Sequence, residues 1–93
     1  NLRIAGYLHY YRDRPQAAVT SLTEAGDAFL AFGDVERAAE AFIDGAWVAI
    51  QAGMSAPARD LSERARLLSR SPLLQPEERF ALARRLGSAA GTE

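Results

Sequence analysis

Residues 22–50, LTEAGDAFLAFGDVERAAEAFIDGAWVAI, carry the clearest structural pattern of the sequence. This stretch carries two glycines, Gly26 and Gly45, inside an apolar pattern of helical spacing. A glycine in a helix interior costs about 1 kcal/mol relative to alanine. The chain uses alanine freely elsewhere, so the helix preference of single residues does not explain these two glycines.

Turn signals around this stretch divide the chain into helices. Gly33 is predicted to cap the C-terminus of one helix and Asp34 the N-terminus of the next. Pro15 suits a first helical turn, and Gly53 ends a helix. The predicted helices cover residues 2–12, 15–32, 35–52, 56–70 with Ser55 as N-cap, and 76–87 with Gly87 at the end. No segment alternates with period two, so the predicted class is all-α, built from antiparallel helices with short connections.

The predicted helix over residues 35–52 has two apolar stripes, whereas an ordinary surface helix has one. One stripe is Val35, Ala38, Phe42, Ala46 and Ala49, and the other is Ala39, Ile43, Trp47, Ile50 and Met54. We therefore expect the helices before and after it to cover both sides, as in stacked helical hairpins.

The region of about 19–52 resembles one tetratricopeptide repeat, a 34-residue helix–turn–helix with large and small residues at fixed offsets. The matching residues are Leu22, Ala25, Gly26, Phe29, Ala38, Phe42 and Gly45, together with the turn GDVERA at 33–38. The resemblance implies that Gly26 and Gly45 let two helix backbones approach closely, while Phe29 and Phe42 fill the space beside the contact. A generic alanine-rich hairpin is the alternative.

The flanking helices match the repeat poorly. A shift of 34 positions puts Arg59 and Asp60 where the two small residues should be. Residues 55–87 therefore look like a degenerate or lengthened second hairpin, and residues 2–12 like half of a hairpin or a cap. The resemblance implies one domain over 1–87, a short array of about five helices. Residues 88–93 are expected to form a flexible C-terminal tail.

Composition excludes several classes of protein. The chain has 93 residues, of which 48% are hydrophobic and 25% charged, as in a single globular domain. It has no cysteine for disulfides or thiolate metal sites. All eleven basic residues are arginine, which fits a GC-rich bacterial genome and excludes a Schiff-base or phosphate-loop lysine. No apolar run reaches the ~18 residues that cross a bilayer, so no membrane insertion is expected. The compartment stays open, with a soluble cytoplasmic protein favoured over a periplasmic one, and a start at Asn1 fits a fragment or a processed product.

The residues available for catalysis are few. His9 is the only histidine, so a packing or surface role is expected for it. No glycine loop has phosphate-binding spacing. The acids Glu36, Glu40 and Asp44 follow helical spacing and fit a solvated face. We therefore expect no enzyme activity, no metal and no cofactor.

Charge is unevenly distributed along the chain. Residues 21–50 hold six acids and one arginine, whereas arginine exceeds the acids on both sides. This asymmetry favours head-to-tail or two-fold association, or a partner that carries arginine; a chance distribution is the alternative. Nucleic-acid binding is not favoured, because acids interrupt the arginines and no aromatic residues are interleaved with them. The arginines concerned are Arg59, Arg66, Arg70, Arg84 and Arg85.

The expected function is a non-catalytic interaction module that binds a protein or peptide. By resemblance, the first helix of the repeat lines the binding surface, which makes the candidate residues Thr20, Thr23, Asp27, Leu30 and Ala31. Capture of an acidic C-terminal tail on that surface is not favoured, because the chain lacks lysine and Asp27 stands where an asparagine would help. The alternative is a homodimerising structural helical domain of a larger bacterial protein, with candidate contacts at Tyr7, Tyr10, Tyr11 and Trp47.

Overall fold

The computed structural model of the chain describes residues 14–89. Four α-helices and no strand are found within this range. The helices are α2 (Pro15–Ala31), α3 (Val35–Gln51), α4 (Ser55–Leu68) and α5 (Pro76–Ala89). The all-α prediction is confirmed. The predicted helix over 2–12 lies outside the described residues, and so do Tyr7, Tyr10, Tyr11 and His9.

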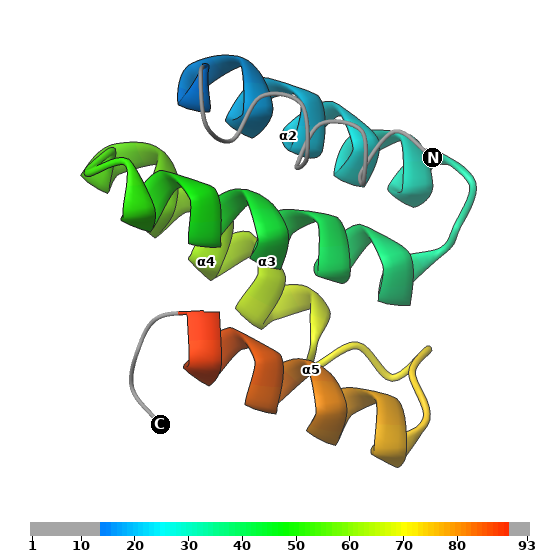
Figure 1. Cartoon of the computed structure of the whole chain (residues 1–93). Helices are drawn as coiled ribbons and strands as arrows, with labels where there is room; N and C mark the ends of the chain where they lie inside the picture. Colours follow the sequence, from blue (N-terminus) through cyan, green and yellow to red (C-terminus); the bar gives the residue numbers. More distant parts are fainter. Residues whose placement is uncertain (1–13, 90–93) are drawn as a thin grey trace.

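The third helix, α3, is the centre of the bundle. It packs against α2, α4 and α5, and successive helices run antiparallel (Figure 1). The molecule measures 37 × 30 × 19 Å. Because a helix with its side chains is about 10 Å across, the shortest dimension corresponds to two layers of helices. The prediction that α3 is covered on both sides is therefore confirmed, and α5 adds a third contact.

The turn between α2 and α3 closes as the sequence predicts. Gly33 has a φ of +80°, and the backbone N–H of Asp34 donates to the carbonyl oxygen of Phe29 at 2.9 Å. This is the Schellman arrangement that satisfies the last carbonyls of a helix. The Asp34 carboxylate then accepts a hydrogen bond from the backbone N–H of Arg37 at 3.1 Å, so Asp34 is the N-cap of α3.

The turn between α3 and α4 repeats this arrangement, which corrects the predicted role of Ser55. Gly53 has a φ of +73°, and the N–H of Met54 donates to the carbonyl oxygen of Ala49 at 2.8 Å. Met54 thus leaves the turn already placed as the N-cap, and its carbonyl accepts from the N–H of Ala58 at 3.0 Å. Ser55 is the first residue inside α4, so its side chain does not cap the helix.

The last helix is longer than predicted. It begins at Pro76 as expected, and the Glu78 carboxylate accepts from the backbone N–H of Gln75 at 2.7 Å, as in a capping box. The prediction that Gly87 ends α5 is wrong, because the helix continues to Ala89. Leu86 and Ala89, on either side of Gly87, pack against the core and hold this turn in place. Residues 88 and 89 of the predicted tail are therefore helical, and the remaining bounds differ from the prediction by one or two residues.

The core lies on both sides of α3. Its largest fully buried side chains are Phe42, Leu22, Leu61, Leu82 and Val48. Each of the four helices contributes at least one of them, and most of α3 is buried. A helix with two apolar stripes is stable only when neighbouring helices cover both of them. The two stripes of α3 are the sequence signature of this central position.

Candidate functional site

The predicted partner-binding surface lies on α2. Thr20, Asp27, Leu30 and Ala31 are exposed and Thr23 is half-buried. The hydroxyls of Thr20 and Thr23 donate to the carbonyl oxygens four residues earlier in α2, at 3.0 and 2.7 Å. Their donor capacity is thus used within the helix. Asp27 and Leu30 carry the chemistry that this surface can offer.

Asp27 is paired with an arginine of the same chain. Nη2 of Arg64, in α4, lies 2.8 Å from Oδ1 of Asp27. The side chains are 36% and 55% exposed, respectively. The Arg64 guanidinium carbon also lies 4.3 Å from the centre of the Phe42 ring, in range for a cation–π contact. One interpretation of the charge pattern is a partner protein that supplies an arginine to the acidic residues. For Asp27, Arg64 of α4 supplies it instead.

The packing around Gly26 places an aromatic ring against the backbone of α2. The Phe42 ring lies against Gly26, so a Cβ at this position would come within 2.6 Å of the Phe42 Cζ. The atoms nearest to this position are therefore those of a ring on α3. An edge of the ring fills the space that the absent side chain leaves.

Gly45 is the position where α3 passes between its two neighbours. A Cβ on Gly45 would lie 2.9 Å from Leu61 Cδ1 of α4 and 3.4 Å from Leu22 Cβ of α2. Among the other predicted packing residues, Leu22, Ala25 and Ala38 are buried and Phe29 is half-buried against the core. The assignment of this packing to a tetratricopeptide repeat stays a prediction.

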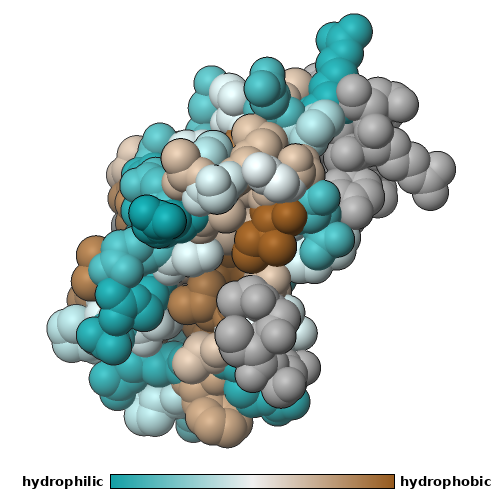
Figure 2. All heavy atoms as spheres, turned by 90° about the vertical axis from the view of Figure 1, so that its left-hand side faces the viewer, coloured by the Kyte–Doolittle hydropathy of each residue, from teal (hydrophilic) through white to brown (hydrophobic). Residues whose placement is uncertain are grey.

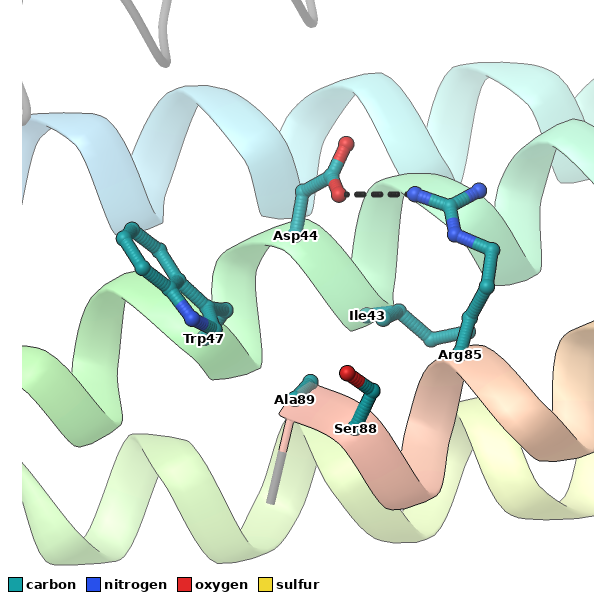
Figure 3. Close-up of a pocket in the computed structure, with 6 residues that line it drawn as sticks. All are labelled: Ile43, Asp44, Trp47, Arg85, Ser88 and Ala89. Atoms are coloured by element: carbon teal, nitrogen blue, oxygen red, sulfur yellow. Dashed lines mark hydrogen bonds and ion pairs between the residues drawn. The ribbon is translucent and has the colours of Figure 1, made fainter. Parts of the chain in front are cut away.

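A shallow depression of about 240 Å³ lies between α3 and α5 (Figure 3). Its lining residues are Ile43, Asp44, Trp47, Arg85, Ser88 and Ala89. The Arg85 guanidinium reaches from α5 to α3, with Nη2 at 3.1 Å from Asp44 Oδ1 and Nη1 at 3.3 Å from Glu40 Oε2. Trp47, a predicted dimer contact, is half-buried beside α5. Part of its surface is thus covered within the chain.

A larger cleft of about 580 Å³ lies between α4 and α5. It is lined by Arg66, Ser69, Arg70, Arg79, Ala83, Leu86 and Gly87. Arg66 pairs with Glu63 of the preceding turn, with Nη2 at 2.6 Å from Oε2. This hydrogen bond lowers the pKa of Glu63 and raises the pKa of Arg66. No residue of the described range forms an ion pair or a side-chain hydrogen bond with Arg70 or Arg79.

A third depression lies between the α2–α3 turn and the α4–α5 loop, with Phe32, Leu73, Glu36 and Glu78 among its lining residues. The pKa of Glu36 is raised, first by partial burial of its carboxyl group and next by the negative charge of Glu78. Phe32 and Leu73 are among the most exposed large apolar side chains, at 88% and 76%.

Most of the exposed large apolar side chains lie towards this end of the bundle. They are Leu30, Phe32, Leu67, Leu73 and Phe80. Ile50 belongs to the opposite end, where α3 finishes, and Figure 2 shows apolar surface across the middle of that end, with polar side chains around it. Five of these six large exposed apolar side chains therefore lie towards the C-termini of α2 and α4.

The part of the chain that the structure describes offers little for catalysis or membrane insertion. No group of three or more histidine, cysteine, aspartate or glutamate side chains within residues 14–89 is placed to hold a metal ion. In the same range, no helix is long and apolar enough to cross a membrane. The absence of catalysis and of a cofactor stays a prediction.

No protein-family model matches the chain, and no curated protein and no solved structure matches it either. The tetratricopeptide resemblance thus rests on the residues of the sequence itself.

Proposed function

We propose that the chain is a non-catalytic protein–protein interaction module of the tetratricopeptide-repeat type, and that it binds a segment of a partner protein. Two observations support the proposal. The buried polar side chains of the described residues are satisfied within the chain, and several large apolar side chains are nevertheless exposed. Among the described residues, no buried side-chain nitrogen or oxygen lacks a hydrogen-bond partner. Large apolar side chains that stay exposed outside the core mark an interface when they gather into a patch.

The observation that carries the proposal is the surface shared by α2 and α4. Both helices run antiparallel to α3 and are therefore parallel to each other (Figure 1). The Asp27–Arg64 ion pair joins them, and Leu30 and Leu67 follow it by three residues on their respective helices. The two leucines are thus one helical turn beyond the ion pair, towards the same end. Their exposures are 36% and 58%.

This surface, defined by Asp27, Leu30, Arg64 and Leu67, is suited to a peptide with apolar anchors. Leucine side chains supply the contact area, and the ion pair links the two helices beside it. A partner's charged residue can also exchange with one member of the pair. The predicted candidate residues Asp27 and Leu30 belong to this surface, whereas Arg64 and Leu67 extend it onto α4.

The test is selection of peptides from a displayed random library, followed by calorimetric titration of the selected peptides. We expect the double substitution Leu30→Ser and Leu67→Ser to weaken binding about tenfold or more, because two apolar contacts are lost. Ile50→Ser is the matched control, since Ile50 is 38% exposed and lies at the opposite end of the bundle. The proposal is wrong if no peptide is selected, or if the control weakens binding as much as the double substitution.

The alternative proposal is a homodimerising structural domain. Sedimentation equilibrium distinguishes it from the first proposal. A binding module should sediment as a monomer at micromolar concentration, whereas the alternative requires a dimer. Since Trp47 already packs against the core of its own chain, we expect the monomer. A dimer that dissociates when Trp47 is replaced by serine would support the alternative instead.

A further inference from the structure

The cleft between α4 and α5 has three arginine side chains at its edges. Arg66 and Arg70 come from the end of α4 and the turn after it, and Arg79 comes from the start of α5. The two helices are antiparallel, so the turn after α4 and the first turn of α5 lie near each other (Figure 1). Positive charge is therefore gathered where the cleft meets the connecting loop.

The chain balances only part of the positive charge at the cleft, since Arg66 and Arg70 both lower the pKa of the single carboxyl group of Glu63. Glu63 is the one carboxylate that pairs with a cleft arginine among the described residues, and it pairs with Arg66. Arg70 and Arg79 have no such partner in that range. The other long-range acid–arginine pairs, at Asp27 and at Glu40 and Asp44, use Arg64 and Arg85 on other surfaces. An anionic ligand is the complement of this cleft.

The rest of the cleft lining is small or apolar. Ala83, Leu86 and Gly87 form its α5 side. Phe80 shares a face of α5 with Ala83 and Gly87, by its spacing of three and seven residues, and is 66% exposed. Small residues let another helix approach, and the exposed ring offers apolar contact beside it. None of the described residues that line the cleft is aromatic, whereas single-stranded nucleic acids need aromatic faces for base stacking. A protein ligand fits this lining better than a nucleic acid.

We infer that the α4–α5 cleft binds an acidic amphipathic helix of a partner protein, whose carboxylates pair with Arg70 and Arg79 and whose apolar side chains pack on Ala83 and Leu86. The inference takes from the proposed function only that the partner is a protein. It concerns a second surface, separate from the one between α2 and α4. Guanidinium groups suit this role, because they bind carboxylates in two-point geometry.

The test is fluorescence anisotropy with the full chain and three labelled probes. The first is a short peptide with glutamate and leucine at helical spacing. The second is the same peptide with each glutamate replaced by glutamine, and the third is oligothymidylate. We expect the acidic peptide to bind at least about tenfold more tightly than the glutamine peptide. Its affinity should fall as the salt concentration approaches about 1 M, where the screening length is about 3 Å.

The variants are the double substitution Arg70→Glu and Arg79→Glu, and the matched control Arg84→Glu. Arg84 is exposed on the same helix as Arg79 but lines a different depression. We expect the double variant to lose about tenfold or more in affinity for the acidic peptide, and the control to lose much less per charge. Circular dichroism checks that each variant is folded.

Several results would overturn the inference. Equal binding of the acidic and glutamine peptides would show that the cleft arginines do not select charge, and would leave the proposed function standing if the L30S/L67S variant lost binding. If the Arg84 control lost as much affinity for each reversed charge as the double variant, the peptide would be responding to the net charge of the protein and not to a site in the cleft. Preferred binding of oligothymidylate would point to nucleic acid. Binding of neither peptide, together with an empty library selection, would contradict the proposed function as well.

Discussion

The ring of Phe42 lies directly on the backbone of Gly26, and Arg64 lies over the same ring at 4.3 Å from its centre. Three helices therefore meet at one aromatic side chain, which is fully buried. Gly26 is retained because the ring needs its space, although alanine would favour the helix. The free-energy cost of a glycine inside α2 is thus offset by a contact that brings α2, α3 and α4 together.

We first predict different responses to alanine at the two helical glycines. Gly26→Ala gains about 1 kcal/mol of helix preference but crowds a buried ring, which costs about 1–3 kcal/mol. We expect net destabilisation of about 1 kcal/mol. Gly45→Ala meets the flexible end of Leu61 instead, so its free energy of unfolding should stay within about 0.5 kcal/mol of the wild type. Urea denaturation measures both.

The Gly26 prediction has an internal check in a double substitution. Phe42→Leu removes the ring edge that a Cβ on Gly26 would meet, at its own cost of a poorly filled core. The double variant Gly26→Ala with Phe42→Leu should therefore be more stable than the sum of the single effects, by about 0.5 kcal/mol or more. Strict additivity would show that the ring is not what excludes alanine.

A second prediction separates the two contacts of Arg64. Arg64→Ala removes both the ion pair and the ring contact, whereas Asp27→Asn weakens only the ion pair. Exposed ion pairs contribute about 0.2–1 kcal/mol and cation–π contacts about 0.5–1 kcal/mol. We expect a loss of about 1–2 kcal/mol for Arg64→Ala and a smaller loss for Asp27→Asn. At high salt the Asp27→Asn effect should vanish and part of the Arg64→Ala effect should remain.

A third prediction concerns pH. The raised pKa of Glu36 means that the fold favours its protonated form, so this group contributes stability at low pH that is lost as the pH rises through its folded-state pKa. At neutral pH, Glu36→Gln should therefore stabilise the protein by about 0.2–0.5 kcal/mol, as expected for the loss of a like-charge contact. The difference should disappear below about pH 4, where glutamate is protonated.

Glu63→Gln is the control of opposite sign. Its pKa is lowered by the hydrogen bond from Arg66, so Glu63 contributes stability above the ordinary glutamate pKa that is lost as the pH falls. This variant should be less stable than the wild type at neutral pH and equal to it in acid. Thermal unfolding of both variants across the pH range measures the two trends. The pH prediction is contradicted if both differences have the same sign.

A fourth prediction concerns the turn glycines. Gly33 and Gly53 have positive φ, and nothing lies within 4 Å of a Cβ placed on either. Alanine there is opposed by backbone conformation alone, at about 1–2 kcal/mol. Gly33→Asn should cost less than Gly33→Ala, because asparagine adopts this conformation more readily. If the two substitutions cost the same, the turn has changed its conformation.

The parts of the fold that depend on local chemistry could be predicted from the sequence. Gly33 and Asp34 close a turn through their own backbone and side-chain groups, and the two stripes of α3 indicate contacts on both sides. The predictions for Ser55 and Gly87 are wrong because the contacts that set the helix ends there are not local. Met54 takes the cap position through its bond to Ala49, and packing of Leu86 and Ala89 carries α5 past the glycine.

The candidate surfaces show the same division. Asp27 and Leu30 could be named because they share a face of one helix. Arg64 could not, because its partner Asp27 lies 37 residues away and no helical spacing connects them. Arg70 and Arg79 likewise approach each other only when α4 and α5 pair. In the sequence, only the uneven distribution of charge indicated such contacts. In the structure, Arg64 and Arg85 form ion pairs with acids of α2 and α3, so part of this charge is neutralised within the chain.

The position of Trp47 beside α5 provides a spectroscopic probe of partial unfolding. Leu82 is the one fully buried side chain of α5, whereas α2, α3 and α4 each bury several, so α5 is the helix that detaches at the lowest free energy. Its departure removes one wall of the depression that the chain's single tryptophan lines, while α2, α3 and α4 stay folded. In rising urea, tryptophan emission should therefore change before most of the helical circular dichroism is lost.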